Sequence, residues 1–101
     1  MKEVVTSKGT LKLKHMNVLE LVKLRGNLVR KLEVEYNGAK LSMDDYGAAL
    51  IELLKDHFDF SGIEGIDSFE KSLEDIEIVQ SMIELSLKVL ESIGEVSKKK
   101  N

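Results

Sequence analysis

The sequence has 101 residues and contains no cysteine, no proline and no tryptophan. Without cysteine, disulfides and thiolate metal sites are excluded, and no redox chemistry can be assigned. Without proline, no residue interrupts a helix by removing a backbone donor. No group of side chains has the spacing of a catalytic, metal or cofactor site. We therefore expect a protein that is not an enzyme and that binds no metal and no cofactor.

Long apolar runs are also missing, and residues 1–9 alternate charged and polar positions. We therefore expect no signal peptide, no membrane span and a cytoplasmic location. The length fits one domain. The prediction is a single helical domain over residues 1–97 with a basic N-terminal arm at residues 1–15, followed by a disordered lysine tail at residues 98–101. The arm is either mobile or contains a short strand at residues 10–14, where apolar and charged residues alternate.

The longest helical pattern covers residues 73–96, and Ser68 or Ser72 is expected to cap it. At about 100° per residue its apolar side chains cover roughly 200° of the helix, whereas a surface helix needs a stripe only somewhat over 100° wide. The helix is therefore expected to be covered from two sides, by its own chain or by a second molecule. One row is predicted to lie in the core with Tyr46, Leu50, Leu54 and Phe58, and it consists of Ile76, Ile83 and Leu90. The second row is predicted to bind a partner protein, and it consists of Ile78, Met82, Leu85 and Val89.

Two capping pairs predict earlier helix starts, Asn17 with Glu20 and Ser42 with Asp45. The first of these helices places on one face Val18, Leu21, Val22, Leu28, Val29, Leu32 and Tyr36, and it could break near Gly26. Residues 32–41 have two interpretations, a continued helix or a β-hairpin that turns at an Asn-Gly pair. The second helix is expected over residues 43–58. In it, Gly47 permits close approach of a neighbour, and His57 lies on the apolar face as a hydrogen-bonded core residue.

These patterns predict a mainly α fold, a small bundle of three to four helices with a short N-terminal strand or a β-hairpin near residues 32–41. The net charge is -3, but basic residues outnumber acids in residues 1–40 and acids outnumber basic residues in residues 41–97. The two halves could complement each other within one chain. Alternatively, they could support head-to-tail contact between copies or attract a charged partner.

Three features together resemble the phage tail assembly chaperones, short proteins made beside the tail tape-measure protein of long-tailed phages. These features are a Leu/Lys segment at residues 10–14 that leads into a helix, an amphipathic middle helix that ends in the aromatic cluster of residues 53–60, and an acidic last helix that opens at residues 72–76. The resemblance implies binding of tape-measure and tail-tube proteins in the host cytoplasm, with self-association into a homo-oligomer. The alternative is a small regulatory or nucleic-acid-binding protein that uses the basic N-terminal half. The basic arm lacks interleaved aromatic residues, so nucleic-acid binding is not expected.

Overall fold

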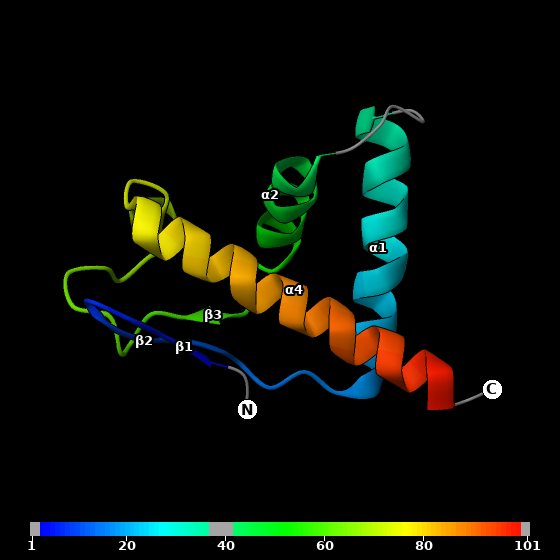
Figure 1. Cartoon of the computed structure of the whole chain (residues 1–101), viewed down its shortest axis with the longest axis horizontal. Helices are drawn as coiled ribbons and strands as arrows, with labels where there is room; N and C mark the ends of the chain where they lie inside the picture. The colour runs from blue at the N-terminus through cyan, green and yellow to red at the C-terminus, as the bar shows by residue number, and fades with distance from the viewer. Residues whose placement is uncertain (1–2, 37–41, 100–101) are drawn as a thin grey trace.

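The computed structural model describes residues 3–36 and 42–99. Its elements are β1 (Glu3–Thr6), β2 (Gly9–Leu13), α1 (Val18–Tyr36), α2 (Met43–Leu53), β3 (Phe58–Asp59), α3 (Phe69–Ser72) and α4 (Ile76–Lys99). The strands form one antiparallel sheet in the order β1-β2-β3. Figure 1 shows α4 crossing the molecule, with the sheet on one side, α2 on the other and α1 beside its C-terminal half. The predicted mainly α fold with a short N-terminal strand is confirmed.

The predicted basic arm is a β-hairpin instead of a mobile segment from residue 3 onward. Alternation along β2 turns Leu11 and Leu13 into the core, and β2 pairs with β1 on one side and with β3 on the other. The turn needs a glycine at position 9, where φ is 130° and a Cβ would lie 1.9 Å from the carbonyl oxygen of Gly62. The hairpin therefore fits closely against the loop that follows β3.

The tip of this hairpin is fixed to the start of α4 by charged groups. The backbone N–H and the hydroxyl of Ser7 donate to the Glu77 carboxylate at 3.0 and 2.5 Å, and Lys8 forms an ion pair with Asp75. The Ser7 hydroxyl lowers the pKa of Glu77, and the hydrogen bond from Lys8 lowers the pKa of Asp75. These contacts hold the sheet against α4.

The capping pair predicted at the start of α1 is confirmed, because the Glu20 N–H donates to Asn17 Oδ1 at 2.8 Å and the Asn17 N–H donates to Glu20 Oε1 at 3.3 Å. The helix then continues without a break past Gly26 to Tyr36. The hairpin interpretation is therefore wrong for the first part of residues 32–41. Its remaining part, residues 37–41, lies outside the described residues.

The capping box at the start of α2 is also confirmed, but α2 ends at Leu53, before the predicted end at residue 58. Residues 54–57 turn, and Phe58 enters β3 opposite Leu13. No glycine or proline in the sequence marks the end of α2. The helix ends where the chain turns to pair Phe58 with β2. The close approach at Gly47 is confirmed, since a Cβ there would lie 2.8 Å from Cγ2 of Ile83 on α4.

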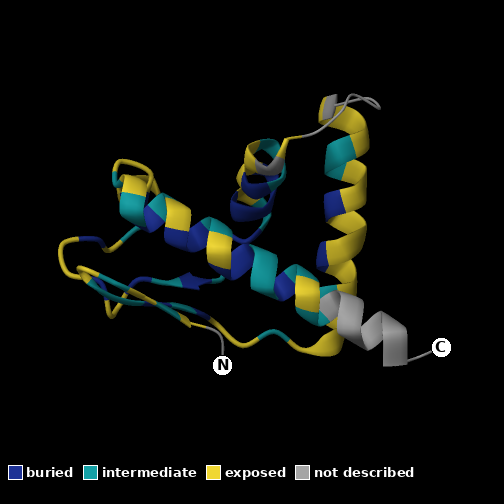
Figure 2. Ribbon diagram, viewed as in Figure 1, coloured by how far each residue is buried: buried dark blue, intermediate teal, exposed yellow. Residues whose placement is uncertain are grey.

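The last helix starts three residues later than predicted. Ser68 caps the short helix α3, where its hydroxyl accepts from the Lys71 N–H, so the prediction that Ser68 or Ser72 caps the long helix is wrong. The side chain of Asp75 takes that place, because its Oδ1 accepts from the Ile78 N–H at 3.2 Å. Figure 2 shows the buried face of α4 running along most of its coloured length.

The structure buries the two predicted rows of α4 differently from the prediction. The row expected to bind a partner, Ile78, Met82, Leu85 and Val89, is 2% exposed or less and lies in the main core. That prediction is wrong because only helices were considered as cover, whereas the sheet and the loop after β3 cover this row. In the row expected in the core, Ile76 is 77% exposed, and Ile83 and Leu90 are partly buried at the core edge. Leu54 and Phe58 are buried in the main core, whereas Leu50 is buried in a second cluster, against which Tyr46 packs, so the predicted single core is divided in two.

Candidate protein-interaction surface

Helix α1 has apolar side chains on both its covered and its exposed side. Leu24 and Leu28 are buried where α1 packs on α2 and α4. The opposite side carries four apolar residues that are 49% to 62% exposed, and we name them the α1 apolar face: Val18, Leu19, Val22 and Val29. At about 100° per residue they lie within roughly 100° of one another on the helix. Figure 2 shows this side of α1 as mostly exposed.

A glycine lies on the same side of α1. Gly26 stands between Val22 and Val29 along the helix, and a Cβ built on it would have no atom within 4 Å. Glycine inside a helix costs about 1 kcal/mol relative to alanine, and none of the described residues fills the space that it leaves. The helix backbone is therefore accessible at the middle of the α1 apolar face.

Basic side chains border the α1 apolar face. Lys23 and Arg30 are exposed and lie two helical turns apart along one edge,. Arg30 donates to Asn27 Oδ1 at 2.5 Å, and Arg25, nearer the other edge, already has an interaction partner. A partner that covers the α1 apolar face must therefore also meet positive charge along one edge.

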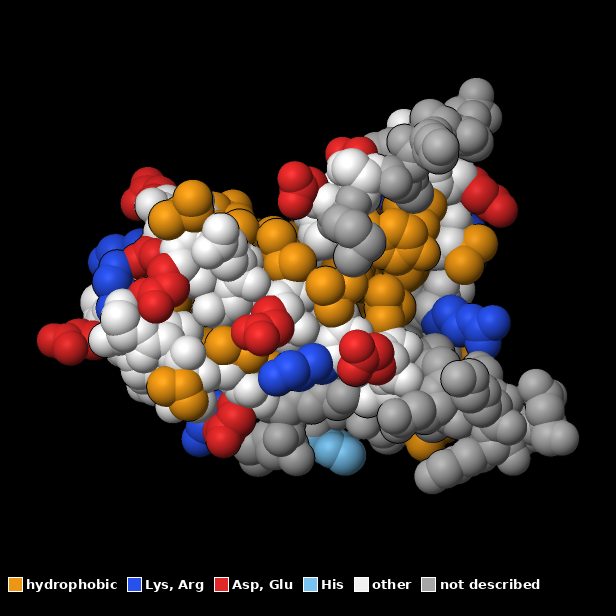
Figure 3. All heavy atoms as spheres, in the orientation of Figure 1, with side chains coloured by type: hydrophobic (Ala, Val, Ile, Leu, Met, Phe, Trp, Pro, Cys, Tyr) orange, Lys and Arg blue, Asp and Glu red, His pale blue; other side chains and the backbone are white. Residues whose placement is uncertain are grey.

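The solvent side of α4 is a second exposed surface and is more acidic. Glu84 and Glu91 are exposed, and Leu87 between them is partly buried. Figure 3 shows acidic side chains along this helix, next to apolar ones over α2 and α1. Lys88 lies beside the two glutamates and already has an interaction partner. We name Glu84, Leu87 and Glu91 the α4 outer strip.

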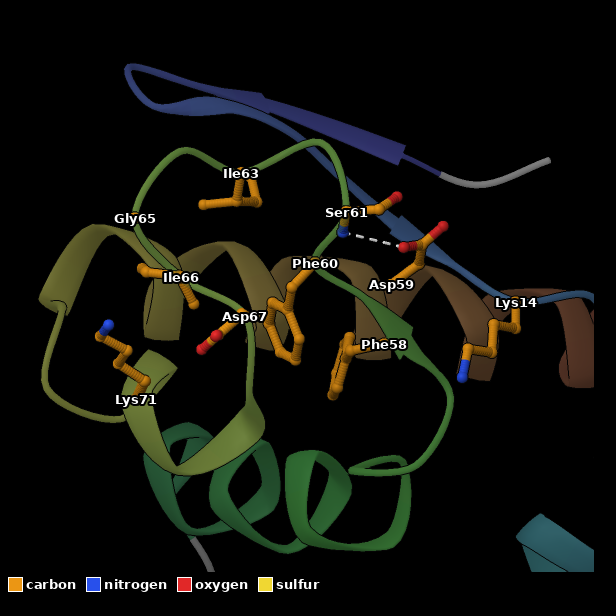
Figure 4. A pocket seen from close by; sticks show the side chains of 10 residues that line it. All are labelled: Lys14, Phe58, Asp59, Phe60, Ser61, Ile63, Gly65, Ile66, Asp67 and Lys71. Carbon is orange, nitrogen blue, oxygen red and sulfur yellow. Dashed lines mark hydrogen bonds between the residues drawn. The ribbon is translucent and has the colours of Figure 1, made fainter.

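A hollow of about 580 Å³ lies beside β3 and the loop after it. Figure 4 shows Phe58 and Phe60 in it, with Lys14 and Lys71 at opposite ends. Asp59 at its rim accepts from the Ser61 N–H at 2.9 Å, and the Ser61 hydroxyl and backbone lower the pKa of Asp59. The two phenylalanines are 9% exposed or less. The hollow therefore combines apolar walls with a rim that carries charges of both signs.

His57 is not on a helix and lacks the hydrogen bond predicted for it. Its Nδ1 is buried without a hydrogen-bond partner, and its Nε2 lies 3.7 Å from Glu20 Oε2. Within residues 3–36 and 42–99 there is no group of three or more His, Cys, Asp or Glu residues that could hold a metal ion.

No family model, curated protein or solved structure matches this chain. Within the part of the chain that the structure describes, no helix is long and apolar enough to cross a membrane. The sequence pattern places Val18, Val22 and Val29 on one face of α1, but it does not separate them from Leu28, which is buried in the structure while these three are exposed. At about 100° per residue, the apolar side chains of α1 cover an arc of roughly 220° from Leu24 to Leu19. An apolar arc of this width predicts that the helix is covered on two sides.

Proposed function

We propose that this chain is a non-enzymatic protein-interaction module that binds a helical partner on the α1 apolar face. The observation that supports this is the exposure of four large apolar side chains on the side of α1 opposite its packed side. Single exposed apolar residues are common on proteins, but contiguous apolar patches on a monomer mark interaction sites. The patch lies on a regular helix of 19 residues. A helix of that length can hold a second helix along most of its face.

The size of the α1 apolar face limits the free energy of binding that this surface alone can contribute. Full burial of one such side chain contributes about 1.5–3 kcal/mol, so burying the exposed half of four contributes on the order of 3–6 kcal/mol. Association costs about 4–15 kcal/mol in lost freedom of motion. The α1 apolar face alone therefore supports only weak binding. A specific partner must also use the neighbouring basic edge at Lys23 and Arg30.

The specific form that we propose is the phage tail assembly chaperone, acting in the host cytoplasm on tape-measure and tail-tube proteins. Its support is the outline resemblance of the sequence together with an apolar helix face of the kind that a chaperone offers to a client. The partner-binding residues of this proposal are those of the α1 apolar face. They replace the buried row of α4.

The experiment coexpresses the chain with a tape-measure protein of a long-tailed phage. The wild type is expected to give a soluble complex. Val22→Glu combined with Val29→Glu is expected to give none, because two charges interrupt the α1 apolar face. Val5→Glu is the matched control, since Val5 is 79% exposed on β1, in the sheet. Circular dichroism checks that each variant is folded.

Two results would contradict this proposal. A folded double variant that keeps the complex would show that the α1 apolar face is not the binding surface. Binding to duplex DNA that weakens by orders of magnitude between about 50 and 200 mM salt would instead favour the nucleic-acid alternative.

A further inference from the structure

We propose that the α4 outer strip of a second copy of this chain docks on the α1 apolar face, so that copies associate head to tail. This inference rests on the proposed function, because it names one occupant of the same surface.

The basic edge of α1 forms no ion pair with an acidic side chain in the described part of the chain. The basic and acidic halves of the chain meet where Lys8 contacts Asp75 and where Lys31 bridges Glu52 at 2.6 Å. Internal complementarity therefore accounts for these charges. It does not extend to Lys23 and Arg30, for which no ion pair is found among the described residues.

The spacing of charges matches between the two helices. Lys23 and Arg30 are seven residues apart on α1, and Glu84 and Glu91 are seven residues apart on α4. At 1.5 Å rise per residue, both pairs span about 10.5 Å. All four side chains are exposed. One acidic residue can therefore meet each basic residue when the helices lie side by side.

The residues between these charges also complement each other. Gly26 lies midway between Lys23 and Arg30 and has open space around its Cα. Leu87 lies midway between Glu84 and Glu91. One side of it packs against the cluster of Leu28, Ala49 and Leu50 in its own copy, and the rest of the side chain stays exposed. The leucine of one copy would pack over the glycine of the next, and side chains inserted between those of a facing helix are the usual basis of helix pairing.

Charge excludes the simpler pairing of α1 with α1. That arrangement would bring Lys23 and Arg30 of one copy next to Lys23 and Arg30 of the other. Like charges at an interface oppose binding. Because the docking surfaces on α1 and α4 differ, the contact is heterologous. It can extend into an open chain of copies or close into a ring.

Two charge-reversal variants test this inference by sedimentation. The first carries Lys23→Glu with Arg30→Glu, and the second carries Glu84→Lys with Glu91→Lys. The wild type is expected to associate with rising concentration. Each variant alone is expected to associate at least about fourfold more weakly, because both ion pairs are lost and both contacts become repulsive.

An equimolar mixture of the two variants is the decisive sample. Each variant then offers the other a surface of opposite charge at both contacts, so the mixture is expected to associate as the wild type does. A monomeric wild type, a mixture that stays monomeric, or a single variant that associates like the wild type would each overturn the inference. A monomeric wild type that still binds the tape-measure protein through α1 would refute only the self-association. A wild type that associates but binds no client would refute only the client.

Discussion

Replacing Gly26 by alanine should make the folded monomer more stable and its association weaker. The glycine is the ninth of the 19 residues of α1, far from either end of the helix. A Cβ at this position would have no atom within 4 Å, so alanine fits without moving a neighbour. The substitution therefore isolates the backbone preference of the helix from side-chain packing.

The expected gain is about 0.8–1 kcal/mol, the difference between glycine and alanine inside a helix. For a domain of this size, that gain corresponds to a rise in the melting temperature of about 4–8 °C. Urea unfolding followed by circular dichroism measures the free energy, and a thermal scan gives the melting temperature. Sedimentation of the same samples should show weaker association, because the added methyl group occupies the space proposed for Leu87 of a second copy.

Gly47→Ala is the matched comparison within α2. Its Cβ would lie 2.8 Å from Cγ2 and 3.1 Å from Cγ1 of Ile83, a β-branched side chain with few rotamers available in a helix. Overpacking costs about 1–3 kcal/mol, which outweighs the gain in helix preference, so this variant should be less stable than wild type. If Gly26→Ala gave no gain, α1 would not be a continuous helix in solution. If it left association unchanged, the glycine would not admit a partner.

The remaining predictions concern the core, a helix cap and acid sensitivity. Met82→Glu with Val89→Glu should abolish the cooperative unfolding transition, because both side chains are buried and an unpaired buried carboxylate is strongly unfavourable,; a folded double variant would place this row on the surface. Ser42→Ala should lower the free energy of unfolding by about 1 kcal/mol in urea, and no loss would mean that the capping box does not form. The Ser7 hydroxyl holds the pKa of Glu77 below its ordinary 4.5. The contribution of the ionised Glu77 to stability should therefore be complete above pH 4.5 and lost as the pH falls through the lowered pKa,. In Glu77→Gln, the free energy of unfolding should depend less steeply on pH between about pH 6 and pH 2.

Local signals in the sequence predicted the helix starts well. The pairs at Asn17 and Ser42 act over three residues, so neighbouring sequence contains all the information needed. The end of α2 was not predictable in this way. It follows from the pairing of Phe58 with Leu13, residues that are far apart in the sequence. A strand of two residues has no periodicity of its own, so β3 could be found only from its tertiary contacts.

The misassignment of the α4 rows has a physical cause that also locates the candidate surface. The helices predicted from the sequence are too few to cover both apolar rows of α4, so the prediction placed one row against a partner protein. In the structure, the β1–β2 hairpin and the loop after β3 supply that cover. Helix α1 then packs mainly through Leu24 and Leu28 at one end of the molecule, and its opposite side stays exposed. The exposed apolar surface is therefore on α1, beside the basic edge of Lys23 and Arg30, and this charge favours an acidic amphipathic helix as its occupant.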